Sequence, residues 1–167
     1  QERLLKMIVV KQNYGFINIY CINANGFIKN ISNEVRALKL LSFSQNHHFL
    51  ASYDVNDYIQ LLNPQTMKPL KKLEKIKEIT SLALSNDGQQ IAYVKVKQYI
   101  EILDINTGEL LHKIKNNMYQ PFIESICYIN NKQLIYKLGN TIKIYDIENE
   151  KNICTFKPNI ENNQILY

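Results

Sequence analysis

The sequence predicts an all-β fold built from repeated four-stranded units, and three observations carry this prediction. One segment recurs along the chain at nearly constant spacing. Each copy of it alternates between apolar and polar residues, and a second apolar pattern precedes most of the copies. The composition agrees with a folded chain, because 46% of its 167 residues are hydrophobic and 21% are charged.

The recurring segment reads YIEILDINTGELLHKI at residues 99–114. Related segments begin at residues 16, 58 and 141, so the four copies are separated by 42, 41 and 42 residues. Repeats of this length build propellers or helical arrays. In every copy the second and fourth positions are aliphatic and the third is polar, as in Ile100, Glu101 and Ile102. Only a strand supports a period of two, so the repeat is predicted to be β.

A second pattern lies upstream of three copies and ends in a large apolar residue, at Phe43, Leu84 or Tyr128. A polar turn follows it, with Gly, Asn or Asp supplying the backbone conformations that tight reversals need. Another short strand comes after the turn. Each period is therefore predicted to hold four short antiparallel strands.

This register also predicts how the strands pack. Phe43, Leu84 and Tyr128 should occupy equivalent buried positions on first strands near a central axis. Isoleucines of the third strands should be buried between neighbouring units. These are Ile100, Ile102, Ile142 and Ile144.

Four strands in about 42 residues is the unit of a β-propeller blade. The stretches LLSFSQNHHFLAS (40–52) and ITSLALSNDGQQIAY (79–93) resemble the first hairpin of a WD-repeat blade, and YIEILDINTGELL (99–111) resembles its third strand and Thr-Gly turn. The resemblance covers nearly the whole chain. Its signature residues are altered: there is no Trp, no Gly-His precedes a first strand, and the terminal dipeptide reads Leu103-Asp104 or Tyr145-Asp146. The family's Asp before the third strand is replaced by Asn56, Lys97 or Gly139.

The resemblance implies about three complete blades and two partial ones, within a larger propeller of the seven-bladed type. The expected units are 1–34, 35–76, 77–118 and 119–159, with 160–167 opening a further blade. The strand at 7–11 is expected in the second-strand slot of the first unit. A four-bladed ring is the alternative, and it requires residues 163–167 to pair beside residues 7–11.

Composition narrows the remaining choices. The formal charge of +5 favours acidic partners without naming one. Cys21, Cys127 and Cys154 are far apart and lack the spacing of a disulfide frame or zinc site, so they are interpreted as reduced thiols in a cytoplasmic protein. No apolar run is long enough for a membrane span. No cofactor is expected.

The residues that resemble catalytic or metal-binding groups have simpler interpretations. His47 and His48 are adjacent in a polar turn, so their side chains point apart and a solvated turn is favoured over a metal or base pair. His112 is expected on an outer strand. Asp54 and Asp57 flank one loop, where carboxylates commonly bind their own backbone. We therefore expect no catalytic residue and no metal site.

Two segments are candidates for binding. The run at 67–78 contains Lys68, Lys71, Lys72, Lys75 and Lys77, which either contact nucleic acid or an anionic surface or protect an exposed sheet edge from pairing. The second interpretation is favoured, because the run lacks stacking aromatic residues.

The loop at 115–122 is the other candidate. It is the longest connection between predicted blades and carries Met118, Tyr119 and Phe122, residues of the kind that anchor interfaces. The alternative is that Phe122 and one neighbour pack against the adjacent blade. Asp57 and Arg36 complete the candidate protein-binding set.

The WD-repeat resemblance implies a non-enzymatic scaffold or adaptor that binds other proteins within a larger assembly. The alternative is a propeller enzyme, a hydrolase or oxidoreductase with its site at the central channel. Fold alone does not separate the two. The expected channel-facing positions, such as Asn56-Asp57, Lys97-Gln98 and Gly139-Asn140, are poor in catalytic residue types, which favours binding.

Overall fold

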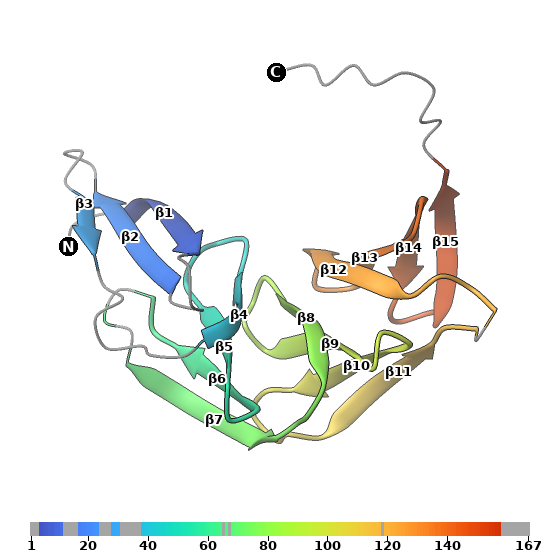
Figure 1. Ribbon diagram of the computed structural model, residues 1–167, viewed down its shortest axis with the longest axis horizontal. Coiled ribbons are helices and arrows are strands. Elements are labelled where there is room, and N and C mark those ends of the chain that lie inside the picture. The colour runs from blue at the N-terminus through green and yellow to red at the C-terminus, as the bar shows by residue number, and fades with distance from the viewer. Residues whose placement is uncertain are drawn as a thin grey trace.

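A computed structural model describes residues 4–11, 17–23, 28–30, 38–64, 66, 68–117 and 119–157. This part of the chain forms fifteen strands in four antiparallel sheets. The sheets follow one another along an arc, each made from one contiguous stretch of sequence (Figure 1). The prediction of an all-β fold of propeller blades is confirmed.

The first sheet has three described strands, β1 (Leu4–Lys11), β2 (Ile17–Asn23) and β3 (Ile28–Asn30). The second consists of β4 (Leu38–Phe43), β5 (Leu50–Asp54), β6 (Tyr58–Leu62) and β7 (Pro69–Lys75). The third consists of β8 (Ile79–Leu84), β9 (Gln90–Lys95), β10 (Tyr99–Asp104) and β11 (Leu110–Lys115). The fourth consists of β12 (Ile123–Asn130), β13 (Gln133–Leu138), β14 (Thr141–Asp146) and β15 (Lys151–Phe156).

The cores lie between the sheets, because each central strand sends alternate side chains to opposite faces. On β9, Ile91 and Tyr93 face the second sheet, while Ala92 and Val94 face the fourth. All four are at most 3% exposed. A central strand buried on both faces reads as a continuous apolar run, which explains the sequence Ile-Ala-Tyr-Val.

Side chains also join the first strands of neighbouring sheets. The backbone N–H of Leu84 on β8 donates to Ser42 Oγ on β4 at 3.0 Å. The N–H of Ile126 on β12 donates to Ser81 Oγ on β8 at 3.1 Å. The first strands therefore contact one another through serine hydroxyls rather than through a continuous backbone ladder.

The packing predictions succeed at the third sheet and partly fail at the second and fourth. Leu84 and Tyr128 are buried, and Ile100 and Ile102 have no exposed surface. Phe43 is only half-buried, so its prediction is wrong; it contacts the ring of His47 with the ring centroids 6.3 Å apart.

Ile142 and Ile144 are also half-buried rather than buried. They are the counterparts of Ile100 and Ile102, but they belong to the last described sheet. Ile100 and Ile102 are covered by the fourth sheet, with which they share a core. Ile142 and Ile144 point away from that core, and this difference in cover explains the error.

Strand pairing defines an apolar row across this outward side of the fourth sheet. Cys127 is paired with Ile135, Ile135 with Ile144, and Ile144 with Cys154. Ile142 is paired with Phe156, which is 51% exposed. We call this surface the outer face of the fourth sheet. Its residues correspond in register to buried residues of the third sheet, including Ala83, Ala92 and Ile114.

The first and last units leave some predictions open. The strand expected at 7–11 is part of β1, which pairs with β2. Residues 163–167, on which ring closure depends, lie outside the described residues. The unit boundaries, the two partial blades and the larger ring therefore remain predictions. In the described ranges, no helix is long and apolar enough to cross a membrane.

Candidate interaction surface

The antiparallel sheets place two kinds of connection at opposite ends of the strands. We call one end the loop face: it carries the connections from second to third strands and those between sheets, including 55–57, 76–78, 96–98 and 116–122. The other end, with the turns 44–49, 63–68, 85–89, 105–109 and 147–150, is the turn face. The predicted binding loop and Asp57 both lie on the loop face.

Hydrogen bonds at both ends hold the loop 116–122 against the third sheet. The N–H of Asn116 donates to the carbonyl of Gln98 at 2.8 Å, and the N–H of Ile123 donates to the carbonyl of Lys97 at 2.8 Å. Asn116 Nδ2 donates to the carbonyl of Pro121, also at 2.8 Å. The two ends of the loop are therefore fixed to the turn 96–98 of the third sheet.

This fixed loop presents aromatic side chains to solvent. Tyr119 is 92% exposed and Phe122 is 57% exposed. Lys97 Nζ lies 5.8 Å from the centroid of the Phe122 ring, within range of a cation–π interaction. Met118 lies outside the described residues. Most large apolar side chains of a folded chain are covered, so an almost bare tyrosine on an anchored loop is a candidate interface residue.

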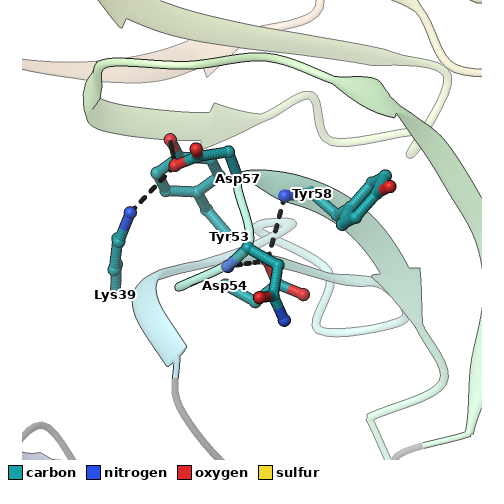
Figure 2. Close-up of polar contacts among 6 residues, drawn as sticks. Lys39, Tyr53, Asp54, Asp57 and Tyr58 are labelled. Carbon is teal, nitrogen blue, oxygen red and sulfur yellow. Dashed lines mark hydrogen bonds and ion pairs between the residues drawn. The ribbon is translucent and has the colours of Figure 1, made fainter.

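Asp57 lies in a polar cluster at the edge of the second sheet, drawn in Figure 2. Its Oδ1 accepts a hydrogen bond from Tyr53 Oη at 2.8 Å and an ion pair from Lys39 Nζ at 2.9 Å. The hydrogen bond from Lys39 holds the pKa of Asp57 below its usual range, and the bond from Tyr53 lowers it further. Burial and the bond to Asp57 raise the pKa of Tyr53 to about 12. The carboxylate of Asp57 is therefore ionised, and the ammonium group of Lys39 balances its charge.

The neighbouring Asp54 binds its own loop. Its Oδ1 accepts the backbone N–H groups of Asn56 and Tyr58, each at 2.9 Å (Figure 2). This is the loop-capping use of Asp that the sequence favoured over acid–base chemistry. Asp54 and Asp57 are held by different partners. Arg36, the other charged candidate, lies outside the described residues.

The lysine run forms the outer strand of the second sheet. Lys71 donates to the carbonyl of Asn106 in the third sheet. Lys72 Nζ lies 3.5 Å from the centroid of the Tyr58 ring. The strand also contributes a buried residue, Leu73. The run therefore lies at a sheet edge. Contact with nucleic acid or an anionic surface and protection of this edge from pairing both stay predictions.

A buried charge cluster in the third sheet was missed by the sequence analysis. Glu101 is 7% exposed, accepts a hydrogen bond from Tyr93 Oη at 2.8 Å and pairs with Lys113 Nζ at 2.6 Å. Burial would raise the pKa of Glu101, but the bonds from Lys113 and Tyr93 outweigh burial and lower it. Burial and the bond to Glu101 raise the pKa of Tyr93. The same position of the repeat holds Gln60 and Lys143 in the neighbouring copies. Alternation alone therefore predicted that Glu101 would also be a polar residue in contact with solvent.

The histidines and cysteines form no metal-binding group among the described residues. His47 and His48 are exposed in a turn, and His112 Nδ1 lies 3.2 Å from Glu150 Oε1. Cys127 and Cys154 are free. A shallow hollow of about 360 Å³ lies on the turn face of the fourth sheet, where Lys132 and Glu148 pair at 2.8 Å. It is not near the loop 116–122.

Known proteins resemble the chain at the level of the fold. Among solved structures, Hsv2 of Kluyvelomyces marxianus, a WD40 propeller, matches 92% of the chain with a TM-score of 0.65 and 12% identity. The chain folds as WD-like β-propeller blades. Among curated proteins, U3 small nucleolar RNA-associated protein 13 of Saccharomyces cerevisiae is 33% identical over 124 residues, or 68% of this chain. No family model matches the WD-like chain.

Both relatives are longer than the aligned region. The WD-like chain spans 14% of the yeast protein and 59% of the Hsv2 chain. The yeast comparison contradicts the expected cytoplasmic location, since the name of that relative associates it with a nucleolar RNA. The expectation rested on reduced cysteines, which the cytoplasm and the nucleus both permit.

Proposed function

We propose that the WD-like chain is a non-enzymatic scaffold that binds protein partners through its loop face, within an assembly of several components. The observation that carries this proposal is the loop 116–122, which is fixed at both ends yet leaves Tyr119 92% exposed. A preordered loop loses little conformational entropy on binding, so its aromatic side chains contribute more to affinity. Met118, Phe122, Asp57 and Arg36 complete the proposed surface.

The yeast relative supports the assembly part of the proposal, because its name describes association with a small nucleolar RNA and hence with other components. The enzyme alternative has no comparable support. In the described part of the loop face, Asp54 and Asp57 are engaged in capping and ion-pair contacts. The partners that hold them are Tyr53, Lys39 and backbone N–H groups, and none of these is the histidine or thiol of an acid–base or nucleophilic pair.

The proposal also places the chain in a larger propeller. The outer face of the fourth sheet repeats the apolar positions that the third sheet buries, so it suits a further blade of the same kind. The greater length of the Hsv2 chain is consistent with additional blades. We propose that such a blade, with first-strand residues like Ile126 and Tyr128, covers Ile142, Ile144 and Phe156.

The scaffold role is tested by comparing partners captured by the wild-type chain and by Tyr119→Ala, with each partner identified and quantified. Leu70→Ala is the matched control, because Leu70 is an exposed apolar residue, at 53%, on the outer strand of another blade. We expect Tyr119→Ala to lose partners that Leu70→Ala retains, at an unchanged thermal midpoint. Equal capture by all three chains would contradict the proposed surface.

A further inference from the structure

Lysines recur where strands reach the loop face. The strands β7, β9 and β11 end at Lys75, Lys95 and Lys115. The connections that follow β7 and β9 add Lys77 and Lys97. We call these five residues the lysine rim. Four of them are exposed and Lys95 is half-buried, so the blades of the second and third sheets carry a row of accessible ammonium groups.

The lysines of this rim form no ion pair among the described residues, although Lys75 and Lys95 act at longer range on the carboxylates of Asp57 and Glu101. The ion pairs of the described residues involve Lys39, Lys113, Lys132, Lys137 and His112, and none involves the rim. Of the acids on this face, Asp57 pairs with Lys39 and Glu124 pairs with Lys137, while the exposed Glu78 follows Lys77 in the connection 76–78. The turn face carries the opposite bias. Its acids are Asp87, Asp104, Glu109, Asp146, Glu148 and Glu150.

Aromatic side chains lie among the rim lysines. Tyr99 on β10 is paired in register with Lys95 on one side and with Lys115 on the other. Tyr58 on β6 is similarly paired with Lys75. Lys97 approaches the exposed Phe122. The surface therefore combines unpaired positive charge with apolar area.

We propose that the lysine rim, together with Tyr119 and Phe122, binds an acidic segment of a partner protein that also carries apolar side chains. This inference rests on the proposed scaffold function and names the chemistry of its partner. Carboxylates of the segment would pair with the ammonium groups, and its apolar residues would cover the two exposed rings. Complementary charge of this kind gives specificity and speeds association.

The arrangement favours an acidic peptide over nucleic acid. Binding of single strands relies on aromatic faces that are open for successive bases to stack. Tyr58 is half-buried with Lys72 over its ring, and Tyr99 is half-buried with Lys113 Nζ 4.6 Å from its ring centroid. These two rings are therefore covered, and the open rings of Tyr119 and Phe122 lie on a single loop rather than in a row along a strand. The rim lysines, by contrast, form no ion pair among the described residues.

The test uses the full chain and two labelled probes of equal formal charge, a glutamate–tyrosine peptide and an oligouridine, with binding followed by fluorescence anisotropy. The rim variant Lys97→Glu/Lys115→Glu is compared with Lys68→Glu/Lys151→Glu, which changes the net charge equally but lies on the turn face. We expect the rim variant to bind the peptide about tenfold more weakly. The control variant should bind it like wild type.

Three results would overturn the inference: no peptide binding, equal weakening by both variants, or stronger rim-dependent binding of oligouridine than of the peptide. Partner capture separates this inference from the scaffold role. If Tyr119→Ala loses its partners while the rim variant keeps them, the scaffold stands and the acidic partner is wrong. All five rim residues lie at the ends of strands or in loops, so unchanged thermal midpoints should accompany every comparison.

Discussion

Tyr93 and Glu101 face each other across the strands β9 and β10, where the tyrosine hydroxyl donates to Glu101 Oε2 at 2.8 Å. Both side chains are buried, and Lys113 binds the other carboxylate oxygen. The core between the second and third sheets therefore has a charged boundary. A buried hydroxyl that loses its acceptor is destabilising, so this pair is sensitive to substitution and to pH.

Glu101→Ala should lower the free energy of unfolding by about 1–3 kcal/mol, because Tyr93 Oη is left without its acceptor. Glu101→Gln keeps an acceptor and should cost less. Chemical denaturation of the two variants at neutral pH measures the difference. Equal losses would contradict the role of the hydroxyl and point to the charge alone.

The same carboxylate predicts a pH dependence. The folded state lowers the pKa of Glu101 below its ordinary value of 4.5, so the folded state binds fewer protons than the unfolded state in that range. The stabilisation is complete above pH 4.5 and is lost as the pH falls through the lowered pKa. The stability difference between wild type and Glu101→Gln should therefore shrink below pH 4.5. A stability difference that grew on acidification would mean that the folded state raises the pKa of Glu101, which contradicts the prediction.

Substitutions in the turn between β9 and β10 should stabilise the fold. Val96 and Lys97 have φ values of 54° and 58°, a conformation that a β-branched residue rarely adopts. Two positive φ values match a type I′ turn, for which Asn-Gly is preferred. Val96→Asn/Lys97→Gly should therefore raise stability by about 1 kcal/mol, measured as a higher denaturation midpoint. Gln98→Gly, at a residue with ordinary φ, should lower it.

Two glycines in turns form a matched pair. Gly88 and Gly108 both have positive φ, 71° and 80°. A methyl group at Gly108 meets nothing within 4 Å, whereas one at Gly88 would come within 2.7 Å of Phe49 Cε2. Gly108→Ala should cost about 1 kcal/mol from backbone strain, and Gly88→Ala should cost more. Urea denaturation of both variants checks this order, which equal costs would refute.

Equivalent isoleucines of successive blades should differ in their contribution. Ile102 is fully buried, so Ile102→Ala should cost about 2–5 kcal/mol. Ile144 is its half-buried counterpart, so Ile144→Ala should lower the free energy of unfolding clearly less in the chain of 167 residues. Thermal and urea unfolding of both variants measure the gap. An equal cost would mean that the outer face of the fourth sheet is already covered.

The repeat itself made the strands predictable. Alternation identified β10 and β14, because successive side chains of a strand point to opposite faces and the polar residues Glu101 and Lys143 fall on the other face from the isoleucines. The second pattern identified β8 and β12. Burial was less predictable. Ile100 and Ile142 occupy the same place in the repeat, yet only Ile100 has a neighbouring sheet to cover it. Whether a face of a sheet is buried depends on which sheet packs beside it. The sequence of one repeat does not contain that information.

The binding surface was only partly predictable. The length and residue types of the loop 115–122 indicated an anchor, and Tyr119 is exposed. The lysine rim was missed, because Lys75, Lys95 and Lys115 lie twenty residues apart and only the alternating strand directions bring them to one face. The signal was available as a Lys at the ends of the three alternate strands β7, β9 and β11. The partners of Glu101 were not visible, since Tyr93 and Lys113 lie on different strands.

The serine hydroxyls that join the first strands also govern how the chain unfolds. Each sheet closes its backbone ladder within about forty contiguous residues, so neighbours share no ladder and are coupled by side-chain packing and isolated hydrogen bonds. Stability then propagates from one neighbour to the next, as in other repeat proteins. Among the described residues, the third sheet has a partner on both sides, whereas the fourth shares a core with the third alone. Amide hydrogens of β13 and β14 should therefore exchange before those of β9 and β10.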